Sequence, residues 1–101
     1  IEEDDIVASF YQAGDKLGHV HVGEANRKLP GMGRDIPWDR IGQALKDIHY
    51  DGAVVMEPFL LTGGSVGADV KVWRDLSNGA DEKQMDLYLK DAVQFLRKKF
   101  L

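Results

Sequence analysis

Apolar residues recur at the three-to-four-residue spacing of an amphipathic helix in three separate parts of the chain. The helices predicted from this spacing cover residues 4–13, 37–49 and 81–100. Their apolar stripes are Ile6, Phe10, Ala13 and, beyond, Leu17; Ile41, Leu45 and Ile48; and Met85, Leu89, Ala92, Leu96 and Phe100. Asp4 or Asp5 is expected to cap the first helix, and Gly14 to end it.

Two short runs between these helices are typical of strands. In residues 17–22 the character alternates, which places His19 and His21 on one face and the two valines on the other. Residues 52–57 form a continuous apolar run that ends in a charge, as expected of a parallel strand buried on both faces. Pro58 ends this strand because proline has no N–H to donate.

Long segments without periodicity follow both predicted strands. Residues 23–35 contain three glycines, one proline and three basic residues, a composition that predicts a loop. Residues 60–80 predict a second loop with a short helix over residues 70–76. Loops of this length are usually functional or disordered. Gly63-Gly64-Ser65 lacks the lysine and the helix-opening motif of nucleotide-binding loops, so we interpret it as a flexible lid.

The alternation of strands and helices indicates right-handed βαβ units on a parallel sheet. Two strands cannot close a sheet or cover three apolar helix stripes. A (β/α)8 TIM barrel usually has about 250 residues, so 101 residues correspond to a quarter to a third of one. We therefore predict an α/β segment of a single TIM-barrel domain over residues 1–101. Alone, this segment is not expected to fold to a stable monomer.

Composition narrows the functional classes. The chain is 44% hydrophobic and 30% charged, as in ordinary globular proteins, and its net charge of −4 argues against nucleic acid as a partner. The longest apolar stretch is far shorter than the roughly 20 residues of a membrane span. The first residues are acidic where a secretory signal is basic, so we expect a cytoplasmic protein. Since cysteine is absent, any metal must be held by His, Asp or Glu.

A potential metal ligand lies at the carboxyl end of each predicted strand, His21 in the first and Glu57 in the second. In a barrel both side chains point inward at the C-terminal rim, where active sites are built. A single buried histidine is more often a hydrogen-bonded core residue, and we favour that structural role for His19. Glu57 has a stronger claim because burying a carboxylate without a metal or a cationic partner is costly. Arg27, in the following loop, either binds oxygens of a polar ligand or is simply solvated.

Four blocks of sequence are informative together. They are Leu17–Arg27, Gly33-Arg34 with Pro37-Trp38, Gly52–Phe59, and Val70–Ser77. In the same order and at nearly the same spacing, these blocks resemble the C-terminal region of the D-psicose (D-allulose) and D-tagatose 3-epimerases, with one extra residue at Asp35-Ile36. The resemblance implies the C-terminal portion of a TIM-barrel isomerase whose N-terminal strands are absent from this chain.

The resemblance also implies a chemistry. A divalent ion, Mn²⁺, Co²⁺ or Mg²⁺, would be bound by His21 and Glu57 together with a glutamate and an aspartate from earlier strands. Glu57 would also be one of two acid/base glutamates, and Arg27 and Phe59 would contact the substrate, although rim packing is an alternative for Phe59. The implied reaction is epimerisation of free ketohexoses at C3, of the D-fructose/D-psicose or D-tagatose/D-sorbose type, through an enediolate. The implied assembly is a homodimer or a homotetramer.

Several alternatives stay open at this point. Another xylose isomerase-like enzyme would bind metal similarly but act on a different sugar or on hydroxypyruvate. A hypothesis of a different class is a non-catalytic segment that completes a barrel only with its missing part. Glu24 is a candidate to orient either Arg27 or His21. Trp38 and Trp73 are interpreted as packing residues.

Overall fold

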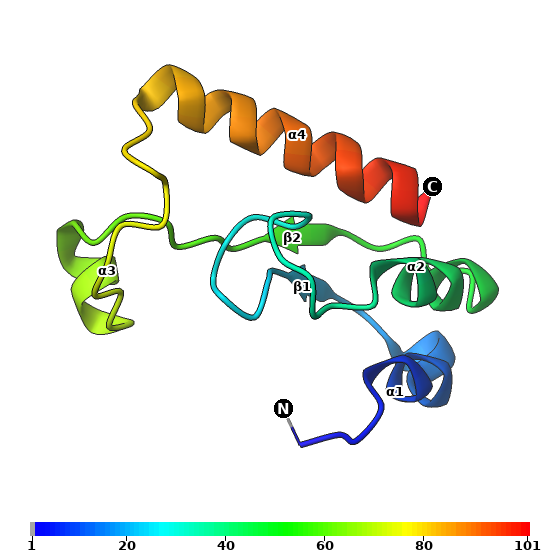
Figure 1. The fold of residues 1–101 in the computed structure, drawn as a ribbon. Coiled ribbons are helices and arrows are strands. Elements are labelled where there is room, and N and C mark those ends of the chain that lie inside the picture. The colour runs from blue at the N-terminus through cyan, green and yellow to red at the C-terminus, as the bar shows by residue number, and fades with distance from the viewer. Residues whose placement is uncertain (1) are drawn as a thin grey trace.

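The computed structural model describes residues 2–101, which form four α-helices, one 3-10 turn and two strands (Figure 1). In chain order the elements are α1 (Ile6–Ala13), the 3-10 turn η1 (Gly14–Lys16), β1 (Val20–Val22), α2 (Trp38–Asp47), β2 (Val54–Met56), α3 (Gly64–Asp69) and α4 (Glu82–Phe100). The predicted order of helix, strand, helix, strand and helix is confirmed. α3 is a short helix at a place where the sequence predicted loop.

The two strands pair in parallel, with α2 in the connection between them. In the register, Val20 lies opposite Val54, His21 opposite Val55, and Val22 opposite Met56. This is the predicted βαβ arrangement. Each strand has three residues, fewer than the predicted ranges of 17–22 and 52–57.

Helix ends follow the predicted capping chemistry. Asp5, rather than Asp4, caps α1, and its Oδ1 accepts from the N–H groups of Val7 at 2.9 Å and Ala8 at 3.2 Å. The bond from Ala8, followed by that from Val7, holds the pKa of Asp5 below its usual value. Gly14 ends α1 with a φ of 50°, in the left-handed region that glycine adopts without strain.

The core lies between the strands and the helices on one side of them. Its buried members are Val7, Val20, Val22, Trp38, Ile41, Ala44, Leu45 and Leu96. Trp38 is 8% exposed, and its ring meets that of Phe95 edge to face at 5.9 Å, which confirms its packing role. The predicted stripe on α4 was partly wrong. Leu89 is 46% exposed, whereas Met85, Tyr88, Ala92 and Leu96 face the rest of the chain.

Residues 60–80 differ most from the sequence prediction. The short helix is α3, over Gly64–Asp69, and not the predicted 70–76, where Lys71 adopts a φ of 58° that interrupts a helix. A Cβ at Gly67 would lie 3.2 Å from the carbonyl oxygen of Thr62, so this small residue lets α3 pack on the preceding backbone. Trp73 is 80% exposed, and its predicted packing role was therefore wrong within this chain.

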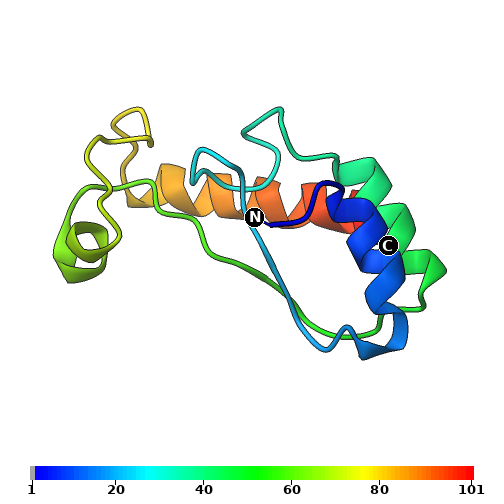
Figure 2. The same ribbon diagram turned by 90° about the horizontal axis from the view of Figure 1, so that it is seen from below.

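One face of the two strands is open. Figure 2 shows α2 and α4 to one side of the strand segments, and no element among residues 2–101 covers the other side. Val55 on that face is 38% exposed, so the prediction of a strand buried on both faces was wrong for β2 within this chain. In a closed barrel, the inner face of each strand is covered only by side chains of the other strands. Residues 2–101 contain two strands, so this face stays uncovered. Among the described helices, none has the length and apolar character needed to cross a membrane.

We expect the isolated 101-residue segment not to unfold as a cooperative unit. Its radius of gyration is 14.8 Å, against about 13 Å for a compact domain of this length, and large apolar side chains such as Leu61 and Val66 are half exposed. Differential scanning calorimetry of the monomeric segment should show no heat-capacity peak. A sharp transition at monomeric concentration would contradict this expectation.

Candidate active site

His21 and Glu57 meet on the open face of the strands. His21 lies opposite Val55, so a side chain two residues beyond Val55 projects from the same face of the neighbouring strand. The Nδ1 atom of His21 lies 3.3 Å from Oε2 of Glu57, a contact whose donor depends on the histidine tautomer. The two predicted residues are thus brought together. The prediction that Glu57 is buried was wrong for this chain, since the side chains are 51% and 62% exposed where no further strand covers them.

His19 lies beside this pair, one step earlier on the same face. Its ring centroid is 4.8 Å from that of His21, with the planes inclined at 62°. His19 is itself exposed and makes no hydrogen bond among the described residues. Its ring therefore borders the imidazole of His21, and the structural role as a hydrogen-bonded core residue that the sequence favoured for His19 was wrong for this chain.

Arg27 and Phe59 are joined through their backbones. The N–H of Phe59 donates to the carbonyl oxygen of Arg27 at 2.9 Å, and this bond ties the loop after β1 to the end of β2. Arg27 itself has a φ of 65° and donates its N–H to the carbonyl of Glu24 at 2.9 Å, which closes a tight turn. Arg27 and Phe59 consequently lie at the same rim as Glu57, two residues before Phe59 along the chain.

A cavity of about 160 Å³ lies beside Arg27, between the two long loops. It is lined by Ala25, Asn26, Arg27, Lys71, Val72, Trp73, Arg74 and Leu76.

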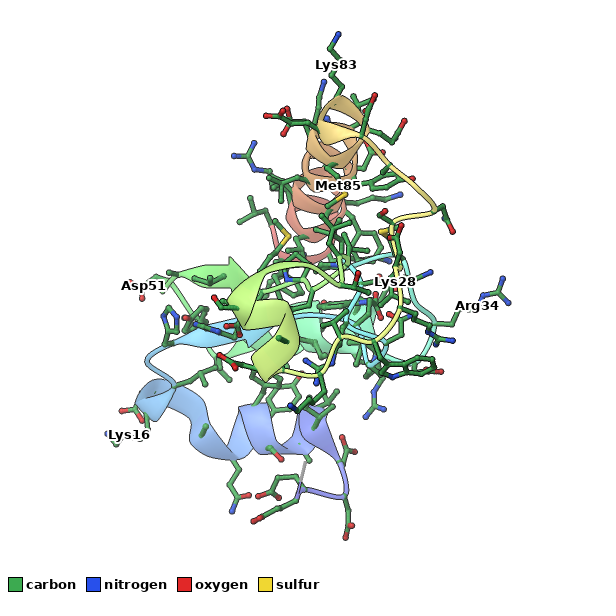
Figure 3. The ribbon with its side chains drawn as sticks, turned by 90° about the vertical axis from the view of Figure 1, so that its left-hand side faces the viewer. Lys16, Lys28, Arg34, Asp51, Lys83 and Met85 are labelled. Atoms are coloured by element: carbon green, nitrogen blue, oxygen red, sulfur yellow. The ribbon has the colours of Figure 1, made fainter. Side chains whose placement is uncertain are left out.

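The side chain of Asp75 bonds to Ser77, which does not line this cavity. Its carboxylate accepts from the hydroxyl of Ser77 at 2.6 Å and from the N–H of Ser77 at 2.7 Å, and these bonds keep the pKa of Asp75 below its usual value. Arg34 extends away from the molecule (Figure 3).

Glu24 is the residue of this region that sequence reasoning left undecided. It is 6% exposed, and its carboxylate accepts from the N–H of Gly31 at 2.7 Å and from the indole N–H of Trp38 at 2.9 Å. In the described part of the chain its carboxylate makes no hydrogen bond to the side chain of Arg27 or His21. One signal in the sequence could have drawn attention to Glu24. It is the one acidic residue between Gly23 and Arg34, where the other charged residues are basic.

The donor atoms of His21 and Glu57 fit part of a divalent metal site. An imidazole nitrogen and a carboxylate oxygen suit Mn²⁺ or Co²⁺, and the carboxylate suits Mg²⁺. Among residues 2–101, however, no group of three or more His, Cys, Asp or Glu side chains is placed to hold a metal. If the pair binds a metal, it would supply two ligands, and further ligands would have to come from outside the described residues.

Residues 1–98 match the family model described as the xylose isomerase-like TIM barrel. The chain therefore belongs to that family, in agreement with its parallel βαβ unit and with the fold class predicted from the sequence. The family places this chain among barrels whose catalytic groups lie at the C-terminal ends of the strands, the end that His21 and Glu57 occupy.

Relatives of this chain include D-psicose 3-epimerases. The chain is 59% identical over 97 residues to D-psicose 3-epimerase of Ruminiclostridium cellulolyticum, covering 96% of this chain and 33% of that protein. It is 56% identical over 97 residues to D-psicose 3-epimerase of Agrobacterium fabrum, with the same coverage. The structure matches the crystal structure of the Clostridium cellulolyticum H10 D-psicose 3-epimerase with D-tagatose at a TM-score of 0.93 and 57% identity, covering 99% of this chain and 34% of that one. The chain thus spans about a third of these relatives' length.

Proposed function

We propose that this chain is the C-terminal portion of a ketose 3-epimerase, which inverts C3 of a free ketohexose such as D-psicose or D-tagatose. The observation that carries the proposal is the 3.3 Å contact between His21 and Glu57 at the carboxyl ends of paired parallel strands. The identity of 59% to a D-psicose 3-epimerase supports the same substrate class.

The reaction follows from the chemistry of a ketose. The C3 proton is acidic because the carbonyl at C2 delocalises the charge left when a base removes that proton. A divalent ion bound by His21 and Glu57 would supply positive charge that stabilises the resulting enediolate. The proton is removed on one face of the sugar and another is returned on the opposite face, which inverts the centre.

Glu57 is proposed as one of the two acid/base groups. Its carboxylate projects from the open face and is 62% exposed, so it is accessible to a substrate that occupies the barrel interior. As a base it would accept the C3 proton of one epimer, and as an acid it would return a proton when the reaction runs the other way. The second acid/base group is proposed to lie on a part of the barrel outside this chain.

Arg27 and Phe59 are proposed to hold the sugar at the rim. The guanidinium has several N–H donors in a planar array that suits hydroxyl and carbonyl oxygens. Phe59 is partly buried and offers an apolar surface next to the same turn. With both anchors joined by one backbone hydrogen bond, the sugar's position would be fixed relative to Glu57.

The complete protein is proposed to contain the remaining barrel strands, a Mn²⁺, Co²⁺ or Mg²⁺ ion, and a homodimeric or homotetrameric assembly. The open strand face and the exposed Val55 support the first of these, because such a face is stable only when covered.

A comparison of substrates tests the proposed function. The full-length protein that contains this chain should be assayed on D-fructose, D-tagatose, L-ribulose and hydroxypyruvate with each metal. We expect the highest kcat/KM on a ketohexose, with the C3 epimer as the product. An aldose product, or a preference for hydroxypyruvate, would instead assign the protein to another reaction of the same family.

A further inference from the structure

We propose that Glu24 is a positioning residue for the active site: its buried carboxylate fixes the loop of residues 23–35 so that Arg27 lies correctly over the strand end that carries His21. This inference rests on the proposed function, since Arg27 is taken as a substrate contact. Glu24 does not itself reach the His21–Glu57 pair; it acts through the backbone of its loop.

The carboxylate of Glu24 joins two distant parts of the loop region. Its Oε1 atom accepts from the N–H of Gly31, seven residues later, and from the indole of Trp38, at the start of α2. Trp38 is anchored in the core against Phe95 and Phe100. The part of the loop around Gly31 is therefore tied, through Oε1 of Glu24 and the indole of Trp38, to helices α2 and α4.

The main chain of Glu24 holds the first part of the loop, residues 24–28. Its carbonyl accepts from the N–H of Arg27 at 2.9 Å, and its N–H donates to the carbonyl of Lys28 at 3.3 Å. These two bonds form the turn in which Arg27 adopts its φ of 65°. One residue thus connects the turn that bears Arg27 with the core that bears Trp38, and the bond from Phe59 to Arg27 continues the connection to β2.

The energetics indicate that Glu24 is not there for packing alone. Its Oε2 atom is buried and has no hydrogen-bond partner among the described residues. An unpaired buried polar atom lowers stability. An apolar residue at this position would leave the N–H of Gly31 and the indole N–H of Trp38 without their acceptor, so the carboxylate is kept for these two bonds. Gly33 lies directly against this carboxylate: a Cβ at position 33 would meet Oε2 and would lie 2.7 Å from Cδ. The loop therefore closes around the carboxylate on the side opposite its two donors.

The functional consequence is a loop with a fixed shape. A displacement of a substrate-binding group by about 1 Å lowers catalytic efficiency up to about 100-fold, so a loop without regular structure needs such an internal support. Residues 23–35 contain no helix or strand in which backbone bonds would supply it. Glu24 provides this support from inside the loop.

The test uses the full-length enzyme with Glu24→Met, which keeps the side-chain length and removes the oxygen that accepts from Gly31 and Trp38, whereas Glu24→Gln keeps an accepting oxygen and should stay close to wild type. We expect KM for the ketose to rise about tenfold, with kcat and bound metal within about twofold of wild type, because Arg27 is displaced and the metal ligands are not. Amide exchange at Gly31 and indole exchange at Trp38 should both accelerate. Trp38→Phe, which removes one of the two donors, should give a smaller rise in KM.

A double-mutant cycle distinguishes positioning from general stability. In an Arg27→Ala background, Glu24→Met should change KM by less than about twofold, since the residue it positions is already gone. Glu3→Met, at an exposed carboxylate outside the loop, is the matched control. Full additivity with Arg27→Ala, or an unchanged KM in Glu24→Met, would overturn the inference. Failure of the wild type to epimerise any ketose would overturn the proposed function instead, and the exchange rates at Gly31 and Trp38 would still decide whether Glu24 holds the loop.

Discussion

Replacing Glu57 with glutamine in the full-length protein is expected to lower epimerisation by about 10²- to 10⁴-fold, the usual contribution of a general acid or base. Glutamine keeps the length and shape of the side chain but neither accepts nor returns a proton at neutral pH. Because Glu57 is also a proposed metal ligand, the thermal midpoint is compared at saturating metal, where the variant should remain folded. Steady-state turnover of D-psicose, together with a thermal melt, measures both quantities.

Glu3→Gln serves as the control for charge removal, because Glu3 is an exposed carboxylate that precedes α1. It should retain full activity. If Glu57→Gln turned over within about threefold of wild type, Glu57 would not be an acid/base group, since such a group contributes at least about 100-fold.

Replacing His21 with alanine is expected to lower metal affinity and activity together. Loss of a residue that only supports a ligand typically weakens metal binding about 10- to 100-fold, and loss of a ligand itself should weaken it at least as much. Elemental analysis after dialysis should find less metal in the variant, and added Mn²⁺ or Co²⁺ should restore part of the activity. The imidazole contacts Glu57, so the variant should also lose part of the order of that carboxylate.

His49→Asn is the matched control for this variant. His49 precedes β2, at the opposite end of the strand from Glu57. It adopts a φ of 55° that asparagine tolerates. Its removal should change neither metal content nor turnover. Unaltered metal content in His21→Ala would remove His21 from the ligand set.

The features that the sequence predicted well are those set by local periodicity. The alternation through Val20, His21 and Val22 determines which side chains face the core, and the structure has both valines buried and the histidine exposed. Because the end of the second strand is marked by Glu57 and Pro58, the parallel pairing also predicted that His21 and Glu57 would meet. Asp5 and Gly14 end α1 for equally local reasons.

The features that it missed depend on contacts between distant residues. α3 contains Gly64 and Gly67, which disfavour helix, so its existence depends on packing against the backbone near Thr62. The partners of Glu24 lie 7 and 14 residues away, at separations that no periodicity reveals. The exposure of Trp73 and Val55 also could not be read from composition, since both are apolar residues that the described chain leaves uncovered.

The central claim is that Glu57 takes part in proton exchange at C3 of a ketose, and proton NMR in D₂O tests it most directly. The full-length enzyme should introduce solvent deuterium at C3 of D-psicose or D-tagatose while the C2 carbonyl stays in place, and Glu57→Gln should abolish inversion at that carbon. Retention of hydrogen at C3 during turnover by the wild-type enzyme, or migration of the carbonyl to C1, would contradict the account.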